Sequence, residues 1–153
     1  MKIGESWELP HSVIAACFEV HRALGPGLLE SMYEAGLCEE LELRGIPFVQ
    51  QKPIPVLYKG KRLEQAYRLD LVVDERLVVE IKAIDGLLPV HAAQVVTYLR
   101  LTGIEDGLLV NFNTLSLRHG LRRVSRTHPN SRSSRSPDLP VKKSRPARGV
   151  QQS

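Results

Sequence analysis

Apolar residues recur every three or four positions near the N-terminus, which is the pattern of an amphipathic helix. One such pattern runs from Leu9 to Leu24 and stops at Gly25-Pro26-Gly27, and a second runs from about Leu28 to Arg44. Gly45 and Pro47 mark the end of the second pattern, because glycine often ends helices and proline cannot continue one. The first third of the chain is therefore expected to form two helices.

From Phe48 onward the apolar period changes to two, which indicates β-strands. The predicted strands span Phe48–Tyr58, Leu63–Val73, Leu77–Ala83, Gly107–Phe112 and Leu117–Val124. A helix that begins at Pro89 and stops at Gly103 separates the third strand from the fourth. This order predicts an α/β domain with a mixed sheet, antiparallel in its first half and joined by a helical crossover to its second.

Two prolines lie within the first predicted strand, and a turn follows it. Pro53 and Pro55 confine that strand to an edge or an irregular position, because proline cannot donate to a ladder. Lys59-Gly60 is then expected to turn the chain back.

Charge divides the 153 residues unevenly. Residues 1–124 carry 14 Lys and Arg against 16 Asp and Glu, whereas residues 125–153 carry 7 against 1, so the pI near 9.3 comes from the C-terminal segment. Residues 1–124 also hold 61 of the 65 apolar residues, enough for one core. We predict one domain over 1–124 and a basic disordered tail over 125–153, which either binds phosphates non-specifically or is an inconsequential extension.

Neither a membrane span nor a signal peptide is expected. No apolar run approaches the roughly 18 residues that a span needs, and Met1–Pro10 lacks the basic and apolar regions of a signal peptide. The chain is therefore predicted to be soluble and cytoplasmic, with no membrane partner. Cys17 and Cys38 fall within apolar helical patterns and are expected to be packed thiols rather than a disulfide or a metal pair.

The predicted hairpin at residues 63–83 brings two carboxylates together. A three-residue connection at 74–76 pairs Val73 with Leu77 and, counting outward, Asp70 with Glu80. Directly opposed Cβ atoms lie roughly 4.5–5.5 Å apart, a spacing at which like charges destabilise a sheet. A positive group is therefore expected between them.

Strand alternation puts Lys82 on the same face as Glu80. The opposite face is expected to carry the apolar residues Leu69, Leu71, Val79 and Ile81. One interpretation of the charged face is a solvated surface with cross-strand ion pairs. The other is a site for Mg²⁺ or Mn²⁺, which take oxygen ligands, with the lysine beside the attacking water.

Asp70 followed by Glu80-Ile81-Lys82 resembles the D…(D/E)-x-K signature of the PD-(D/E)xK nuclease superfamily, although Leu69 replaces the usual proline. The positions Gly27, Glu30 and Tyr33 are similar to the motif of the GxxExxY family, a branch of that superfamily. The similarity continues through Asn111-Phe112-Asn113 and covers about residues 11–126.

The resemblance implies a restriction-endonuclease-like fold, in which helices flank a mixed central sheet, and a metal-dependent nuclease that hydrolyses DNA. It implies that Asp70 and Glu80 hold Mg²⁺ or Mn²⁺ with help from Glu30 and the backbone carbonyl of Ile81, and that Lys82 acts on the attacking water. Glu34, one helical turn after Glu30, is the alternative to Glu30 as the third carboxylate.

Gln94 and Tyr98 look like the Q-x-x-x-Y element of RecB-like nucleases. Either they face the site or the nucleic-acid backbone, or they cap and pack their helix. Tyr33 is expected to be a buried aromatic residue in the core or beside the site. Relatives with an iron–sulfur cluster need four cysteines, and this chain has two.

Other functions remain open at this point. The chain is either an active nuclease, a catalytically silent nucleic-acid-binding or protein-interaction module with the nuclease fold, or a subunit active only within a complex. Many relatives in the superfamily form homodimers, but no segment of the sequence identifies an interface.

Overall fold

The computed structural model describes residues 5–64 and 67–126, which form three α-helices, one 3₁₀ helix and seven strands. The helices are α1 (Glu5–Leu24), α2 (Glu30–Leu43), α3 (Pro89–Thr102) and the 3₁₀ helix η1 (Leu117–Gly120). The strands are β1 (Phe48–Ile54), β2 (Leu57–Tyr58), β3 (Lys61–Arg62), β4 (Tyr67–Val73), β5 (Leu77–Lys82), β6 (Asp106–Asn111) and β7 (Leu121–Ser125).

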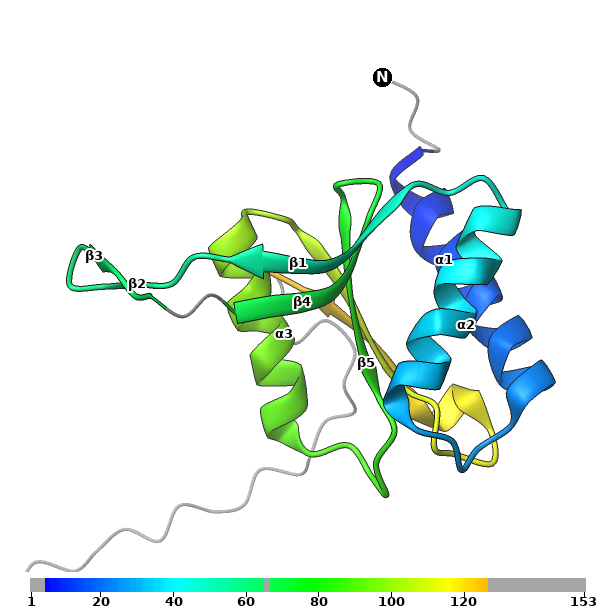
Figure 1. The fold of residues 1–153 in the computed structure, drawn as a ribbon. Helices are drawn as coiled ribbons and strands as arrows, with labels where there is room; N and C mark the ends of the chain where they lie inside the picture. The colour runs from blue at the N-terminus through cyan, green and yellow to red at the C-terminus, as the bar shows by residue number, and fades with distance from the viewer. Residues whose placement is uncertain (1–4, 65–66, 127–153) are drawn as a thin grey trace, which may run out of the picture.

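Five strands form one mixed sheet in the order β1-β4-β5-β6-β7. The pairs β1–β4, β4–β5 and β6–β7 are antiparallel, while β5 and β6 are parallel and are connected through α3. Figure 1 shows α1 and α2 on one side of this sheet and α3 on the other. The predicted mixed α/β fold and its helical crossover are confirmed.

Both faces of the sheet are covered, so the core has two parts. Under α1 and α2, Val13, Cys17 and Leu37 pack against the sheet, and under α3, Val95 and Leu99 do so. β5 is buried at every position from 77 to 81, as expected for a central strand with helices on both faces. The covered centre of the sheet is the scaffold on which the hairpin's charged residues are placed.

Leu69 lies on a different side of the sheet from the predicted one. Leu71, Val79 and Ile81 pack under α1 and α2, whereas Leu69 packs with Val72 under α3. The reason is a local irregularity, because the paired ladder between β4 and β5 ends at Leu71 and Val79. The simple alternation of sides therefore does not continue through the next two residues of β4.

The strand predicted over residues 48–58 is broken. β1 ends at Ile54, Pro55 follows outside any strand, and Pro53 lies in β1 at the edge of the sheet, as predicted. The next predicted strand joins the main sheet only from Tyr67. Between them β2 and β3 form a separate two-stranded sheet around the predicted turn at Lys59-Gly60.

The last predicted strand begins later than expected. Residues 117–120 form η1, and only β7 joins the sheet. Gly120 explains part of the difference, because a Cβ at this position would lie 2.2 Å from the carbonyl oxygen of Asn111. The close approach of these two backbones requires glycine and favours a turn before β7.

Three further predictions concern the ends of the chain, membranes and thiols. Ser125 is the last residue of β7, so the sheet extends one residue past the predicted domain boundary, and residues 127–153 of the predicted tail lie outside the described residues. Within the described ranges, no helix is long and apolar enough to cross a membrane. Cys17 and Cys38 are free thiols, and burial raises the pKa of Cys17 to about 12.

Candidate functional site

The β4–β5 hairpin brings Asp70 and Glu80 to adjacent positions on neighbouring strands. Val73 pairs with Leu77 and Leu71 with Val79, which is the predicted register. Asp70 and Glu80 are the next residues outward along the two strands, at the point where the paired ladder ends. The two carboxylates therefore lie just beyond the last paired residues of the hairpin, where the backbone hydrogen bonding between β4 and β5 has ended.

Asp70 is half-buried and is held by a backbone hydrogen bond. The N–H of Ile81 donates to Oδ2 of Asp70 at 2.8 Å. Burial raises the pKa of Asp70 and the charge of Glu34 adds to this, whereas the Ile81 N–H and Lys82 act in the opposite direction. One oxygen of Asp70 is thus held against β5, the strand that carries Glu80 and Lys82.

Glu80 is a buried carboxylate with one unsatisfied oxygen. Only 5% of the residue is exposed, and Oε1 lies 3.4 Å from Nζ of Lys82 while Oε2 is buried without a hydrogen-bond partner. Burial, reinforced by the charge of Asp70, raises the pKa of Glu80 to about 7. A buried carboxylate costs free energy unless a cation or donors satisfy it, and Lys82 reaches only one of the two oxygens.

Glu30 and Glu34 approach this site from the first turns of α2. Burial raises the pKa of Glu30, and the nearby charges of Asp70 and Glu34 raise it further while Lys82 opposes them. Glu34 makes a direct contact, because its Oε1 accepts a hydrogen bond of 2.6 Å from Nε2 of Gln51. The structure therefore brings both predicted α2 carboxylates toward the hairpin rather than selecting one of them.

Gln51 is a site residue that the sequence did not indicate. Its Nε2 lies 2.6 Å from Glu34 and 3.5 Å from Oδ1 of Asp70, so its amide links α2 to β4. Gln51 also has a φ of 52°, a left-handed conformation that is uncommon for a residue other than glycine. Only the pairing of β1 with β4 could have identified it, because that register places Gln51 opposite Asp70.

Gln94 and Tyr98 lie on α3 with buried polar atoms that lack partners. Oε1 of Gln94 and the hydroxyl of Tyr98 are both buried without a hydrogen bond among the described residues. Burial raises the pKa of Tyr98 well above its usual range, and the neighbouring Tyr67, whose ring centroid is 4.9 Å away, and the charges of Glu80 and Asp70 add to the shift. Tyr98 is therefore close enough to the hairpin carboxylates to interact with them.

Tyr33 is buried and supports the loop before α2. Its hydroxyl donates to the carbonyl of Gly25 at 2.6 Å and accepts from the N–H of Leu28 at 3.1 Å, and its ring stacks on Phe112 with centroids 4.7 Å apart. Gly25 and Gly27 have φ values of 66° and 99°, which favour glycine in this bend. Tyr33 thus fixes the position at which α2, and with it Glu30, begins.

The family model described as the PD-(D/E)XK nuclease superfamily matches residues 7–124. The chain belongs to the PD-(D/E)XK nuclease superfamily. The match covers every predicted site residue and ends one residue before the end of β7.

Two other comparisons add little to the superfamily assignment. No curated protein matches the sequence. The structure described as "Crystal structure of SSO0001" is similar over 77% of this chain, with 21% sequence identity and a TM-score of 0.47. The aligned region covers 57% of that chain, so this chain spans little more than half of the length of its structural neighbour.

PD-(D/E)XK nucleases generally use divalent metals, and the hairpin residues are suited to such an ion in part. Asp70 and Glu80 supply carboxylate oxygens, and the unpartnered Oε2 of Glu80 is an oxygen that a cation would satisfy. Within residues 5–64 and 67–126, however, no three His, Cys, Asp or Glu side chains are gathered closely enough to hold a metal. Because Mg²⁺ keeps several waters and is commonly held by one or two carboxylates, the chemistry of Asp70 and Glu80 fits this ion.

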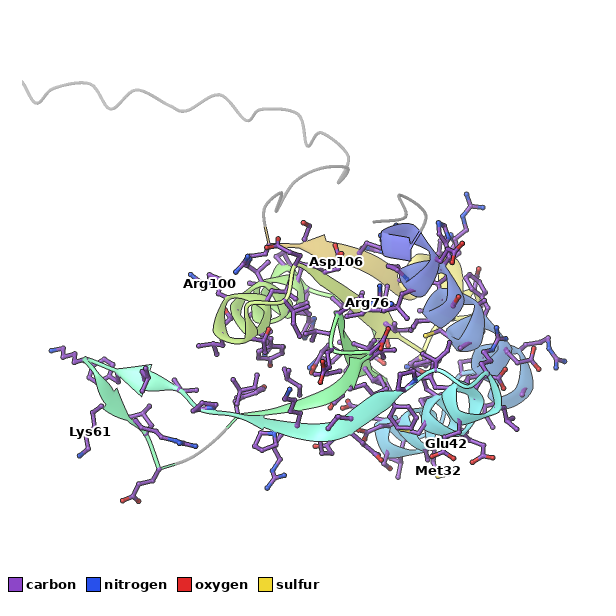
Figure 2. All side chains as sticks on the ribbon, turned by 90° about the horizontal axis from the view of Figure 1, so that it is seen from above. Met32, Glu42, Lys61, Arg76, Arg100 and Asp106 are labelled. Carbon is purple, nitrogen blue, oxygen red and sulfur yellow. The ribbon has the colours of Figure 1, made fainter. Side chains whose placement is uncertain are left out.

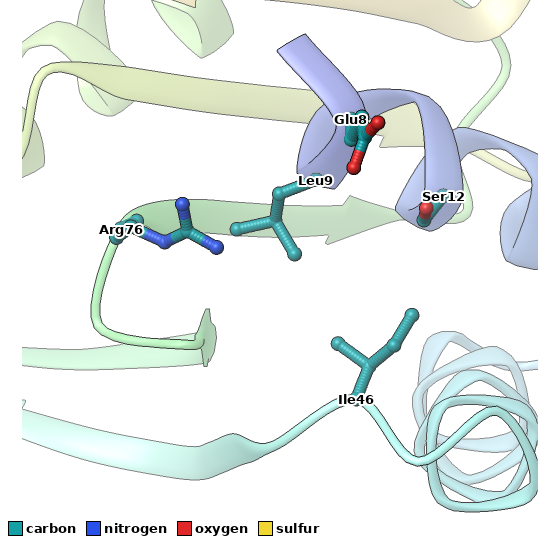
Figure 3. Close-up of a pocket in the computed structure, with 5 residues that line it drawn as sticks. All are labelled: Glu8, Leu9, Ser12, Ile46 and Arg76. Carbon is teal, nitrogen blue, oxygen red and sulfur yellow. The ribbon is translucent and has the colours of Figure 1, made fainter. Parts of the chain in front are cut away.

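A pocket of the described surface lies elsewhere on this nuclease-superfamily domain. It has a volume of about 280 Å³ and is lined by Glu8, Leu9, Ser12, Ile46 and Arg76, as Figure 3 shows. Arg76 belongs to the turn of the β4–β5 hairpin, at the end opposite to Glu80 and Lys82. None of the predicted site residues lines this pocket, so the candidate site lies apart from it.

Proposed function

We propose that this chain is a metal-dependent nuclease that hydrolyses DNA phosphodiesters and that it belongs to the GxxExxY branch of its superfamily. The observation that carries the proposal is the buried carboxylate of Glu80 beside the half-buried carboxylate of Asp70, with Lys82 3.4 Å from Glu80 and one oxygen of Glu80 without a hydrogen-bond partner. A bound cation would satisfy this buried oxygen.

The proposed site residues have two roles, binding the metal ion and acting on the attacking water or the phosphate. Asp70 and Glu80, with the carbonyl of Ile81 and a carboxylate from α2, would hold Mg²⁺ or Mn²⁺. The bound ion would supply Lewis-acid chemistry, polarising a phosphate oxygen and lowering the pKa of a water. Lys82 lies beside Glu80 and would donate a hydrogen bond to the attacking water or to the negative charge that develops on the phosphate.

Four further residues of the proposed site have orienting roles and do not act on the reacting atoms: Glu34, Gln51, Gln94 and Tyr98. The amide of Gln51 donates hydrogen bonds to both Glu34 and Asp70, and its proposed role is to orient the Asp70 carboxylate. Tyr98 lies close enough to Glu80 and Asp70 for their charges to raise its pKa, and Oε1 of Gln94, on the same helix, is a buried polar atom without a hydrogen-bond partner among the described residues. Their proposed role is to orient substrate on the α3 side of the sheet.

The test incubates supercoiled, linear, single-stranded and branched DNA with the full chain and Mg²⁺ or Mn²⁺. Cleavage is expected to disappear with EDTA and to fall by about 10²-fold or more in Lys82→Ala and Asp70→Ala, because each removes a group that acts on the developing charge or the metal. The matched control is Asp74→Asn, in the turn of the same hairpin. Metal-dependent cleavage that persists in both site variants would refute the assignment.

Metal binding is a second readout that does not require turnover. Mn²⁺ is expected to raise the melting temperature of the wild type by several degrees, since a ligand that binds only the folded state stabilises it. Glu80→Gln should abolish the shift, and Glu75→Gln, on the exposed turn, should not. Salt-sensitive DNA binding without cleavage or a metal-dependent shift would instead favour the catalytically silent binding module.

A further inference from the structure

Residues 55–64 form an arm that stands away from the domain. Its two short strands pair only with each other, Leu57 opposite Arg62 and Tyr58 opposite Lys61. Figure 1 shows the arm extending beyond the ends of β1 and β4, and in Figure 2 the labelled Lys61 lies on this extension, far from the helices. None of its residues belongs to either core cluster of the described chain.

The turn specifies the shape of the arm without help from the core. Lys59 and Gly60, the two residues between the paired positions, have φ values of 49° and 76°. Positive φ at both central residues is the conformation of a type I′ turn, which matches the twist of a two-residue hairpin. The N–H of Leu63 also donates to the carbonyl of Val56 at 2.9 Å, so the ribbon is formed before any partner binds.

Positive charge is concentrated on the arm and its base. Residues 52–68 carry five of the 14 Lys and Arg residues of positions 1–124 but only one of their 16 Asp and Glu residues. Lys59, Lys61 and Arg62 are exposed, and in the described structure none of them forms an ion pair. Because the remainder of the domain carries more acidic than basic residues, this arm is a place on it where a polyanion is attracted.

The arm also exposes apolar and aromatic surface. Leu57 is 66% exposed and Tyr58 61% exposed, and Nζ of Lys59 lies 5.5 Å from the centre of the Tyr58 ring. A two-stranded hairpin that packs on nothing is marginal in water. A preformed ribbon that combines cations with an aromatic ring is suited to a partner that offers both phosphates and apolar base edges.

We propose that the arm is a binding surface for duplex DNA and that it lies in a groove beside the phosphodiester presented to Asp70, Glu80 and Lys82. This inference rests on the proposed nuclease function for the identity of the substrate. The major groove of B-DNA, about 12 Å wide, admits a two-stranded β-ribbon. Lys59, Lys61 and Arg62 then contact the phosphates that border the groove.

The arm and the hairpin site can reach the same duplex. Lys61 and Asp70 are nine residues apart, so the chain between them spans at most about 30 Å. One turn of B-DNA is about 34 Å long. One helical turn of a duplex held by the arm is therefore long enough to reach the carboxylates, since Asp70 lies on β4, only a few residues after the arm.

Fluorescence anisotropy with a labelled 20-base-pair duplex tests the inference on the full chain in EDTA, where no cleavage occurs. The arm variant combines Lys59→Gln, Lys61→Gln and Arg62→Gln. Its affinity at 50 mM salt is expected to fall about tenfold or more, and the slope of log K against log salt to shrink by about two to three, because each lost phosphate contact removes about 0.9. The matched control, Arg22→Gln with Arg100→Gln and Arg118→Gln, removes the same charge from exposed positions on α1, α3 and η1 and should change the affinity by less than about twofold.

The outcomes separate this proposal from the nuclease assignment. If the arm variant matches the control, or if the wild type does not bind the duplex, the arm is not the DNA-binding surface. If light scattering shows that the arm variant loses a dimer while duplex binding is unchanged, the arm contacts a second copy and the proposal is wrong. Binding that depends on the arm in a chain that cuts no DNA would support this inference and count against the proposed catalysis alone.

Discussion

The β4–β5 hairpin and the β2–β3 arm are built alike but lie in opposite environments. Each turns through two consecutive residues of positive φ, Asp74 and Glu75 in the first and Lys59 and Gly60 in the second. The first hairpin is in the centre of the sheet and buries Glu80, with Lys82 mostly buried beside it, whereas the arm exposes its charges and its apolar side chains. Turn chemistry makes a hairpin, and the surroundings decide what its side chains can do.

The same residue type illustrates the difference. Lys82 is mostly buried and lies 3.4 Å from Oε1 of a buried glutamate, while Lys61 is exposed on the arm. In the low dielectric of the sheet a charge acts strongly on its neighbours, and in water the same charge is screened. Lys82 is thus suited to reaction chemistry and Lys61 to attracting a distant polyanion.

Truncating one leucine in each hairpin should give the largest contrast in stability. Leu71→Ala is expected to lower the free energy of unfolding by about 3 kcal/mol, because it opens a cavity in the fully buried core. Leu57→Ala should change it by less than about 0.5 kcal/mol, because that side chain is already mostly in water. Urea denaturation followed by circular dichroism measures both, and comparable losses would show that the arm is part of the core.

The pH dependence of stability tests whether the hairpin carboxylates are buried at a cost. Glu80 has a pKa raised to about 7, so between pH 4.5 and 7 the folded chain holds a proton that the unfolded chain has released. Stability therefore falls as the pH rises through this window, by up to about 3 kcal/mol. Asp70 and Glu30, whose pKa values are also raised, change stability in the same direction.

Urea denaturation in EDTA at several pH values between 4 and 8 measures this loss. Glu80→Gln is expected to flatten the curve, since an amide has no proton to release. The difference between the wild type and Glu80→Gln isolates Glu80 from histidines that titrate in the same range. A difference curve without slope would show that Glu80 ionises as freely in the folded chain as in the unfolded one.

Removing one lysine from each hairpin should have a smaller but still unequal effect. At pH 8 in EDTA, Lys82→Ala is expected to destabilise the chain by about 2 kcal/mol, because Glu80 is left buried without its cation. Lys61→Ala should cost less than about 0.5 kcal/mol. Urea denaturation measures both variants, and the Lys82→Ala loss should shrink at pH 5, where Glu80 is protonated. An equal loss at both pH values would indicate that Lys82 acts through packing and not through charge.

Sequence periodicity was sufficient for the main elements of the fold. The apolar periods located the three helices and the central strands, and the short connection at 74–76 gave the observed register from Val73–Leu77 to Leu71–Val79, one residue short of the predicted pairing of Asp70 with Glu80. These features are predictable because they depend on residues close together in the chain. The family resemblance added the nuclease superfamily, which the match over residues 7–124 supports.

Features that depend on distant pairing or on backbone irregularity were not predictable. The contact of Gln51 with Glu34 and Asp70 requires β1 to pair with β4 across the arm, and its positive φ has no sequence signal. Leu69 changes sides because the β4–β5 ladder ends one residue before Asp70. The arm was not predicted because its residues fell within two predicted strands, 48–58 and 63–73. Alternation of apolar and polar residues does not show whether a pair of strands belongs to the main sheet or forms a separate one.

Single substitutions in the two turns are expected to give the smallest effects on stability and the most direct comparison of the hairpins. Glu75 has a φ of 56° without being glycine, so Glu75→Gly should relieve strain and raise the free energy of unfolding by about 0.5 kcal/mol.

Gly60 has a φ of 76° with nothing within 4 Å of an added Cβ, so Gly60→Ala introduces strain of about 1 kcal/mol and no clash. Because the arm opens independently of the core, that strain should leave global unfolding unchanged and speed amide exchange at Leu63, whose N–H closes the arm, by about fivefold. Urea denaturation and hydrogen exchange followed by NMR measure the two responses, and a global loss in Gly60→Ala would mean that the arm folds as one unit with the sheet.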